Sequence, residues 1–460
     1  MTQPPDSSSS NHAAIAALIE GLRAELVVVR KRVAALEKEN AELRARLGKP
    51  PKTPENSSLP PSQGRKPSTE TTVKGKGNRK PHPGAHRALH PNPTHKLTVT
   101  ADCCEHCRAD LSKERQSARE TYDHIEIPRI EPTITQITLM AGLCPCRGKP
   151  FKAKAPEGFA PGSPFGPNLR AHAMYLRYAH GVSFERLAQS FSCLFGLDIS
   201  EGALVNMIKA SRDAFTRQTE SIRRDLFAGD VMASDETTQR VGKKNWWLWV
   251  FHHAKSAVFK LKPSRGKDVV EAFLGEHRPG YWISDRYGSQ TGWAVKDQQF
   301  CLAHLIRDAQ YAIDAGDAIF APGLKTLLKY ACALGQRRDK LKDSTLRAYA
   351  YKLDARLDEL MALETKTKEG QKLQIAIKGC RRHLFVFMTN REISPTNNGS
   401  EQSLRPAVVF RKITNGFRSE WGAEFYAGIR SVIETGRRRG IGALEAIRLT
   451  LSGLPLAQAP

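Results

Sequence analysis

Three acidic residues, Asp235, Asp285 and Glu401, stand where a fold could gather them into one cluster. Asp235 and Asp285 each end a short apolar run typical of a β-strand, and Glu401 opens a helix-like segment rich in cations. Carboxylate oxygens are the ligands that Mg²⁺ prefers, and two such ions can activate an attacking oxygen and stabilise a leaving one. The acids therefore predict a site for phosphoryl transfer with two Mg²⁺ ions, which Mn²⁺ could replace.

Each acid also has a simpler interpretation. An aspartate at the end of a strand is commonly a turn former or a helix cap. The order and context of the three acids together favour the metal site. Glu236, the neighbour of Asp235, would point to the opposite face of a strand, so we do not expect it to share the metals.

The charge of the chain indicates a polyanionic partner. Its 460 residues carry a formal net charge of +24. Such a charge would steer the protein toward DNA and release the counterions of the DNA phosphates on binding. An anionic membrane surface could use the same charge, but no apolar run approaches the roughly 20 residues of a membrane span, and the N-terminus lacks the basic-then-apolar order of a signal peptide. We expect a soluble, cytoplasmic protein that associates with DNA.

The segments around the acids predict a ribonuclease H-like α/β core over residues 229–420. Three sequential strand-like runs precede a helix and a fourth strand, VMASDE, NWWLWVFHH, SAVFKLKP, GKDVVEAFLG and YWISDR. In such a fold the carboxylates lie on the first strand, beside the fourth and on a later helix. A charged helical insertion at about 317–388 would delay the third carboxylate, and a helical segment at 421–460 would follow.

Cations and one Cys–His pair accompany the acids. Cys301 and His304 have ligand-like spacing, but a lone pair of this kind is more often a buried cysteine and a hydrogen-bonded histidine. The cations could hold the scissile phosphate or its neighbours, or they could only offset repulsion among the acids. The residues predicted to contact DNA are His304, Arg307, Arg405, Arg411 and Lys412.

A seven-residue apolar repeat dominates residues 12–48. Its two seams are Ile19, Leu26, Val33 and Leu47, and Ile15, Leu22, Val29, Leu36 and Leu43. Asn40 interrupts the first seam, where paired asparagines hold two parallel helices in register. The repeat predicts a parallel homodimeric coiled coil, or a higher oligomer, and the alternative is a lone amphipathic helix packed on its own domain.

Residues 49–98 are rich in Pro, Gly, Ser and cations. This composition predicts a disordered linker that either lies along DNA or only adds solubility.

Two cysteine pairs then fall within residues 99–155. Cys104 and Cys107 have the spacing of a zinc knuckle, and Cys144 and Cys146 could complete a tetrahedral Zn²⁺ site. Because only one residue separates the second pair, Cys103 or His106 could substitute, or the site could be degraded. The strand-like runs 124–130 and 134–143 predict a small metal-stabilised ribbon.

Residues 156–228 have helical periodicity. They contain a helix, a glycine-bearing turn and a second helix opened by Ser200. The pattern predicts a helix-turn-helix, and an ordinary helical hairpin explains it equally well. The first candidates for phosphate contact are Arg177, Arg186, Lys209 and Arg212. Together the segments predict a multidomain α+β protein.

The chain resembles the DDE transposases of the bacterial insertion sequence 66 family. The resemblance covers nearly the whole chain, and the motifs that carry it include NSSLPPSQ, SDET, SDRYG, CLAHLIRD, TNNGSEQSLRP and FRSEWGAE. It implies that Asp235, Asp285 and Glu401 are the metal ligands of an enzyme that binds terminal inverted repeats and cuts and joins transposon ends. It also implies two small companion proteins.

The chain departs from the family at two places. Thr396 stands where many relatives have Asp, and CPC stands where many have a full CxxC. Two other functions fit part of the sequence. A non-catalytic DNA-binding regulator would explain the first half and leave the acids without a role, and a ribonuclease H-like nuclease would cut DNA without joining it.

Overall fold

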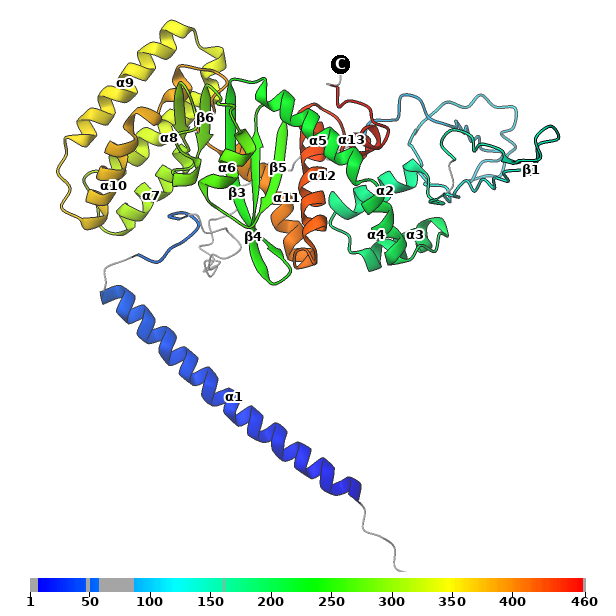
Figure 1. Ribbon diagram of the computed structural model, residues 1–460, viewed down its shortest axis with the longest axis horizontal. Coiled ribbons are helices and arrows are strands. Elements are labelled where there is room, and N and C mark those ends of the chain that lie inside the picture. Colours follow the sequence, from blue (N-terminus) through cyan, green and yellow to red (C-terminus); the bar gives the residue numbers. More distant parts are fainter. Residues whose placement is uncertain (1–6, 47–49, 58–86, 160–161, 458–460) are drawn as a thin grey trace, which may run out of the picture.

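The computed structural model describes residues 7–46, 50–57, 87–159 and 162–457. Figure 1 shows a long helix α1 (Ser7–Arg46), a sheet with helices around it, and an extended segment beyond the helices α2 to α4. The chain is therefore a multidomain α+β protein, as predicted. No helix in the described ranges is long and apolar enough to cross a lipid bilayer.

The central sheet has five strands in the order β5-β4-β3-β6-β7. They are β3 (Val231–Val241), β4 (Lys244–His252), β5 (Ala257–Lys262), β6 (Tyr281–Ser284) and β7 (Asp297–Phe300). The first three are antiparallel neighbours in sequence order, and β6 and β7 run parallel to β3. The nearly continuous apolar run of β4 fits its place inside the sheet, where Trp249 and Phe251 are fully buried.

The crossover from β5 to the parallel strand β6 is α6 (Lys267–Leu274). Two further helices lie against the sheet, α11 (Asn398–Thr414) and α12 (Glu420–Arg438). On β3 the side-chain amide of Gln239 donates to Ala407 O of α11 at 3.0 Å. Since side chains alternate along a strand, Asp235 points to the same face as Gln239, toward α11.

The outer edge of β5 is closed by α12. The N–H of Ala257 donates to Thr435 Oγ1 at 3.0 Å, and the N–H of Phe259 donates to Ser431 Oγ at 2.8 Å. An edge strand otherwise exposes unpaired N–H groups that can pair with another chain. Helix α12 is therefore part of the core, although it follows the boundary expected at residue 420.

A helical layer lies beside β6 and β7 in Figure 1. It contains α7 (Leu302–Asp314), α8 (Ala321–Arg337), α9 (Asp343–Met361) and α10 (Lys368–Cys380). Its apolar core, which includes Leu324, Leu328 and Ile377, continues onto the face of β3, β6 and β7. Helix α7 follows β7 directly and brings His304 and Arg307 toward the sheet. The segment predicted as an insertion corresponds to α8, α9 and α10.

The helices before the sheet are α2 (Pro167–Tyr178), α3 (Phe184–Phe195), α4 (Glu201–Ala210) and α5 (Arg212–Phe227), and α13 (Ala443–Leu451) packs beside α2. Gly196 ends α3 with a φ of 63°, and the Ser200 hydroxyl accepts from Ala203 N at 3.2 Å to begin α4. A left-handed glycine and a serine N-cap are the usual end and start signals of helices. The predicted helix, turn and helix are therefore confirmed as local structure.

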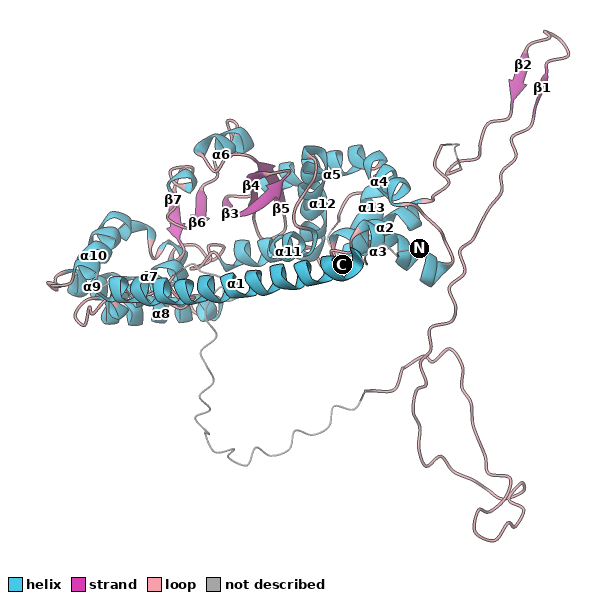
Figure 2. Ribbon diagram, turned by 90° about the horizontal axis from the view of Figure 1, so that it is seen from below, coloured by secondary structure: helices cyan, strands magenta, loops and turns pink. Residues whose placement is uncertain are grey.

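The extended segment of residues 87–159 differs from the prediction (Figure 2). Its only regular pairing in the described residues is between β1 (Ala141–Leu143) and β2 (Pro150–Lys152), which flank the second cysteine pair. The predicted strand 124–130 is wrong, and most of 134–143 is not strand. Ile127 and Ile134 are 77% and 82% exposed, since no other segment pairs with this run.

One residue near the start of the predicted linker contacts the core. Residues 58–86 lie outside the described residues, but Asn56 is buried. Asn56 is 3% exposed, and its Nδ2 donates to Asp314 Oδ2 at the end of α7 at 2.8 Å and to Pro51 O at 3.0 Å. The sequence pattern of a linker does not reveal such a contact, because one amide docking on a distant helix leaves no local signal.

Helix α1 is a single helix of 40 residues. Five residues of its predicted seams, Leu22, Leu26, Val29, Val33 and Leu36, are between 49% and 57% exposed. An apolar stripe on a free-standing helix can be covered by a second helix. Leu47 lies outside the described residues.

Candidate active site

Asp235 lies on β3, and Asp285 directly follows the neighbouring parallel strand β6. The register pairs Val231 with Tyr281 and Ala233 with Ile283, so two residues farther along each chain Asp235 stands beside Asp285. Neighbouring strands are about 5 Å apart. Both carboxylates therefore lie at the carboxyl-terminal edge of β6, where the sheet opens.

Glu401 is brought to the same edge by the start of α11. The side-chain amide of Asn397, just before the helix, donates to Ser234 O of β3 at 2.8 Å. Ser400 Oγ donates to Asn397 Oδ1 at 2.6 Å, and His252 Nε2 of β4 then donates to Ser400 Oγ at 2.8 Å. These buried bonds fix the first turn of α11 on β3 and β4, one residue before Glu401.

The charges at this edge act on one another. Burial raises the pKa of Asp235 well above its usual range, and the negative charges of Glu236, Asp285 and Glu401 raise it further. Asp235 Oδ1 accepts one hydrogen bond from Glu236 N at 2.8 Å, which acts in the opposite direction. The three predicted acids are therefore close enough to repel, as ligands of a shared cation would be before the cation binds.

Glu236 points to the other face of the sheet, as its place on the strand predicts. Its side chain is only 2% exposed and accepts from Arg265 Nε at 2.6 Å and from the Gln290 amide. Burial raises the pKa of Glu236 although Arg265 opposes the shift. The Arg265 guanidinium also lies 3.9 Å from the centre of the Tyr287 ring.

Tyr287 links this network to the active-site edge, because its N–H donates to Asp285 Oδ1 at 2.9 Å. Arg265, Glu236 and Gln290 therefore support the loop that orients Asp285. No local sequence pattern indicates this network, since Gln290 and Glu236 are 54 positions apart.

Helix α7 supplies the nearest cation. Arg307 Nη1 is 3.9 Å from Glu401 Oε1, and the two side chains are 29% and 32% exposed. His304 lies one turn earlier, and burial and then Arg307 lower its pKa against the pull of Asp285 and Glu401. A pKa below the usual range keeps the His304 ring neutral at pH 7. The structure therefore gathers His304 and Arg307 with the acids.

Cys301 has a structural position. Its buried Sγ accepts from Asn397 N at 3.1 Å, and burial raises the pKa of the thiol. A protonated, buried thiol is a poor metal ligand, so the contact supports the packing interpretation of the Cys301–His304 pair.

The other predicted DNA contacts lie farther along α11. Arg411 donates to the backbone and side-chain oxygens of Thr238 on β3. Arg405 is exposed one turn beyond Glu401 and lines a separate pocket with Arg430 and Arg437, and Lys412 is exposed in the last turn. These three residues are not gathered around the acids.

The comparisons with known proteins agree with this geometry. Residues 162–425, more than half of the chain, match the sequence model of the Transposase IS66 family, a family of the DDE type. No curated protein matches the chain. The chain belongs to the insertion sequence 66 transposase family.

The family match begins just before α2 and ends in α12, so it contains the sheet, the helical layer and all three acids. Membership makes the chain a transposase in general terms. It lies outside α1 and the cysteine pairs, whose functions it does not address.

The described residues do not yet form a metal site as they stand. No group of three His, Cys, Asp or Glu side chains in these ranges could hold an ion. The cation beside Glu401 is Arg307, whose Nη1 is 3.9 Å from Glu401 Oε1. The donor set nevertheless fits a hard cation, because three carboxylates meet at one edge and raise the pKa of the most buried one.

The first cysteine pair lies in a tight turn. Cys104 N donates to Ala109 O at 2.9 Å, and Arg108 N, with a φ of 56°, donates to Cys104 O at 2.8 Å. Cys107 stands three residues after Cys104 in this turn. Hydrogen bonds to the Cys104 sulfur, the largest from Cys107 N, lower its pKa.

The second turn repeats the same pattern of bonds from Cys144 N to Lys149 O and from Gly148 N to Cys144 O. Here Arg147 occupies the place that corresponds to Cys107, and Cys146 lies one residue earlier. Since no described cluster of three ligands is formed, the structure does not support the predicted zinc site of Cys104, Cys107, Cys144 and Cys146.

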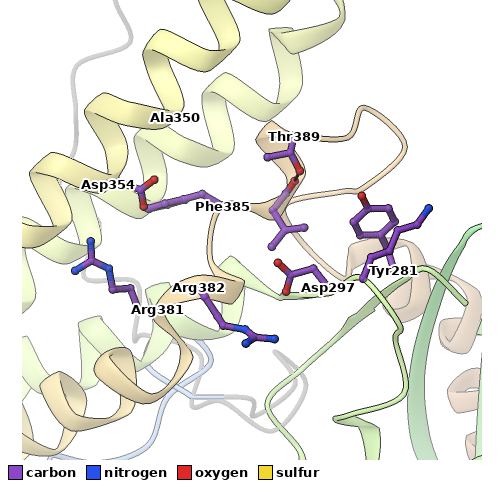
Figure 3. Close-up of a pocket in the computed structure, with 10 residues that line it drawn as sticks. Tyr281, Asp297, Ala350, Asp354, Arg381, Arg382, Phe385 and Thr389 are labelled. Atoms are coloured by element: carbon purple, nitrogen blue, oxygen red, sulfur yellow. Dashed lines mark hydrogen bonds between the residues drawn. The ribbon is translucent and has the colours of Figure 1, made fainter. Parts of the chain in front are cut away.

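A pocket of about 410 Å³, whose lining residues Figure 3 shows, is remote from the acids. It lies at the starts of β6 and β7, by Tyr281 and Asp297, whereas Asp235 and Asp285 lie at the opposite strand ends. Two of its charged groups are paired, Asp297 with His383 at 2.8 Å and Arg381 with Asp358. The pocket therefore has no evident part in the chemistry of the acids.

Proposed function

We propose that this transposase binds the terminal inverted repeats of an insertion sequence, cleaves a DNA strand to expose a 3′-hydroxyl, and joins that hydroxyl to target DNA. The observation that carries the proposal is the position of Asp235 on β3 and of Asp285 directly after the parallel strand β6, beside the anchored start of α11. The strand order β5-β4-β3-β6-β7 supports assigning the core to the ribonuclease H-like fold.

Asp235, Asp285 and Glu401 would hold two Mg²⁺ ions, which Mn²⁺ could replace. When bound, the ions would supply charge for activating the attacking oxygen and for stabilising the leaving 3′-oxygen. Before that, Arg307 offsets the charge of Glu401. As a metal ligand Glu401 would no longer pair with Arg307, and Arg307 would then be available to a DNA phosphate.

The residues around the acids have supporting roles in the proposal. The network of Arg265, Glu236 and Gln290 holds the loop of Asp285, and Asn397 holds the turn of Glu401. His304, Arg307, Arg405, Arg411 and Lys412 are the proposed DNA contacts. Guanidinium groups suit phosphate because they donate two parallel hydrogen bonds.

The remaining parts would bring DNA ends together. Helix α1 would pair in parallel with a second copy, so that one dimer holds two ends, and α3 with α4 would contact DNA. The net charge of +24 would favour backbone contact over the whole surface. Two small companion proteins from the same element could be required for full activity.

The test is cleavage and strand transfer by purified protein on DNA ends from its own element. Asp235→Asn, Asp285→Asn and Glu401→Gln each keep the shape of the side chain and remove a charged ligand, so each should abolish both reactions and leave DNA binding nearly intact. Asp213→Asn, an exposed acid on α5, is the matched control.

The same assay separates the alternatives. Near-normal strand transfer by any one of the three variants would remove that residue from the site. Cleavage without joined product would favour a nuclease, and DNA binding without either reaction in the wild type, with companion proteins present, would favour a regulator.

A further inference from the structure

A second pocket, of about 400 Å³, lies between α11, α12 and the end of α2. It is lined by Ala179, Gln402, Arg405, Arg430, Glu434 and Arg437. Figure 1 shows these helices beside one another, on the α12 side of the sheet. Three of the lining side chains are arginines, which makes the pocket strongly cationic.

Arg430 is the unusual member of this group. Its side chain is only 4% exposed, and its Nε has no hydrogen-bond partner in the described part of the chain. The nearest carboxylate oxygen, Glu434 Oε2, is 4.0 Å from Nη2, which is too far for a hydrogen bond. A buried guanidinium with such incomplete pairing is costly unless an anion completes it.

Glu434 has little capacity left for Arg430. It accepts from Arg437 at 2.6 and 3.0 Å, from Arg438 at 3.0 Å and from Ser403 at 2.9 Å. Burial alone would raise the pKa of Glu434, but the bonds from Arg437 and Arg438 keep it below its usual value. One carboxylate thus serves three arginines of α12, and Arg405 adds a fourth cation at the pocket.

The chemistry of the pocket selects its ligand. Guanidinium groups bind the oxygens of phosphate in paired hydrogen bonds, and Gln402 could add an amide donor. Arg405 follows Glu401 by four residues, which is about 6 Å along a helix. DNA carries one phosphate for about every 3.4 Å of axis on each strand, so a phosphate in the pocket would lie within about two nucleotides of one at the acids.

We propose that Arg405, Arg430 and Arg437 form a binding site for one backbone phosphate of the DNA strand next to the cleavage point. The proposal rests on the function proposed above, because it places DNA along α11. It adds a fixed second contact that sets the position of the strand relative to Glu401. Arg430 and Arg437 are not among the DNA contacts proposed above.

The test is the salt dependence of DNA binding by the full chain without divalent metal, on a random-sequence duplex of about 30 base pairs. Each phosphate contact contributes about 0.9 to the slope of log affinity against log salt concentration. Arg405→Gln and Arg430→Met should each lower the slope by about 0.9, and the double variant should lose little more, since both arginines bind one phosphate. Arg356→Gln, whose side chain is 61% exposed on α9, removes the same charge and should keep the wild-type slope.

A wild-type slope in folded Arg405→Gln would overturn the proposal, as would an equal loss in Arg356→Gln. If Arg430→Met melts early, the exposed Arg405 variant decides alone. A second arm compares melting in sodium phosphate and in sodium chloride of equal ionic strength. Stabilisation by phosphate that Arg405→Gln abolishes, together with an unchanged slope, would assign the pocket to a free anion and also overturn the DNA assignment.

The outcome is independent of the acids. Normal cleavage by the Asp235, Asp285 and Glu401 variants with a lowered slope in Arg405→Gln would refute the proposed catalytic site and leave the phosphate pocket standing. Loss of cleavage in the Asp235, Asp285 and Glu401 variants with a wild-type slope in Arg405→Gln would refute only the phosphate pocket.

Discussion

Replacing Asp235 by Asn should stabilise the metal-free protein. Asp235 is the most strongly perturbed acid of the site, because it is buried beside Asp285 and feels the charges of Glu236 and Glu401. Asparagine keeps the side-chain oxygen that accepts from Glu236 N and removes the charge. The substitution therefore relieves repulsion without removing a contact.

The size of the effect follows from the register of β3 and β6. Two unit charges about 5 Å apart repel by about 1 kcal/mol in water and by about 3 kcal/mol at an effective dielectric constant of about 20. We expect the free energy of unfolding to rise by about 1 to 3 kcal/mol at pH 8. In a unit of this size each kcal/mol raises the melting temperature by about 2 to 4 °C.

The pH dependence has a definite sign. The pKa of Asp235 is higher in the folded state than its usual 3.8, so the folded protein binds this proton more tightly than the unfolded chain. Its contribution to stability is thus present below pH 3.8 and is lost as the pH rises through the folded-state pKa. The difference between Asp235→Asn and wild type should grow as the pH rises above about 4 and then level off.

The assay is thermal melting in EDTA at several pH values, repeated with Mg²⁺. Mg²⁺ should raise the melting temperature of the wild type more than that of Asp235→Asn and so remove the variant's advantage. Asp213→Asn should show neither effect. A variant less stable than the wild type at pH 8 without metal would refute the argument, because Asp235 would then have a favourable partner instead of repelling neighbours.

Two further predictions concern positioning and assembly. Asn397→Ala removes the side-chain donor to Ser234 O and the acceptor of the Ser400 hydroxyl, so urea unfolding should show a loss of about 1 to 3 kcal/mol. Strand transfer should fall while DNA binding remains, and wild-type activity would show that the anchor does not position Glu401. Val29→Pro breaks α1 and should convert the full-length dimer to a monomer in sedimentation. Asn40→Leu should instead raise thermal stability and favour higher oligomers. If the wild type is a monomer at tens of micromolar, pairing through α1 is excluded.

The catalytic strands could be predicted because their signals are local. Short apolar runs that lead into Asp235 and Asp285 indicate where β3 and β6 begin, although β3 continues past Asp235 to Val241. Asp235, in the middle of β3, lies near Asp285 because the neighbouring parallel strand β6 ends at Ser284. The place of Glu401 was harder to predict, because it depends on where a helix begins after a long insertion.

The supporting residues could not be predicted, because their partners are distant along the chain. Asn397 and Ser234 are separated by 163 positions, and Arg438 contacts His253 across 185. The helical pattern of α12 gives no sign that Arg430 would be buried in a pocket. Only the packing of α11 on α12 creates that environment.

The alternating run around Ile127 shows the opposite error. Alternation predicts a strand only where another strand or an apolar surface is available, and the extended segment offers neither beside this run. In the second cysteine turn the backbone follows the first, but Arg147 stands where the ligand was expected.

The most direct test of the catalytic assignment is DNA cleavage by Asp285→Cys in different divalent metals. Mg²⁺ requires oxygen ligands, whereas Mn²⁺ accepts a thiolate more readily. If Asp285 is a metal ligand, the cysteine variant is inactive in Mg²⁺ and recovers cleavage of its own transposon ends in Mn²⁺, and Asp285→Asn stays inactive in both. Cleavage at the wild-type rate by Asp285→Cys in Mg²⁺ would contradict the account.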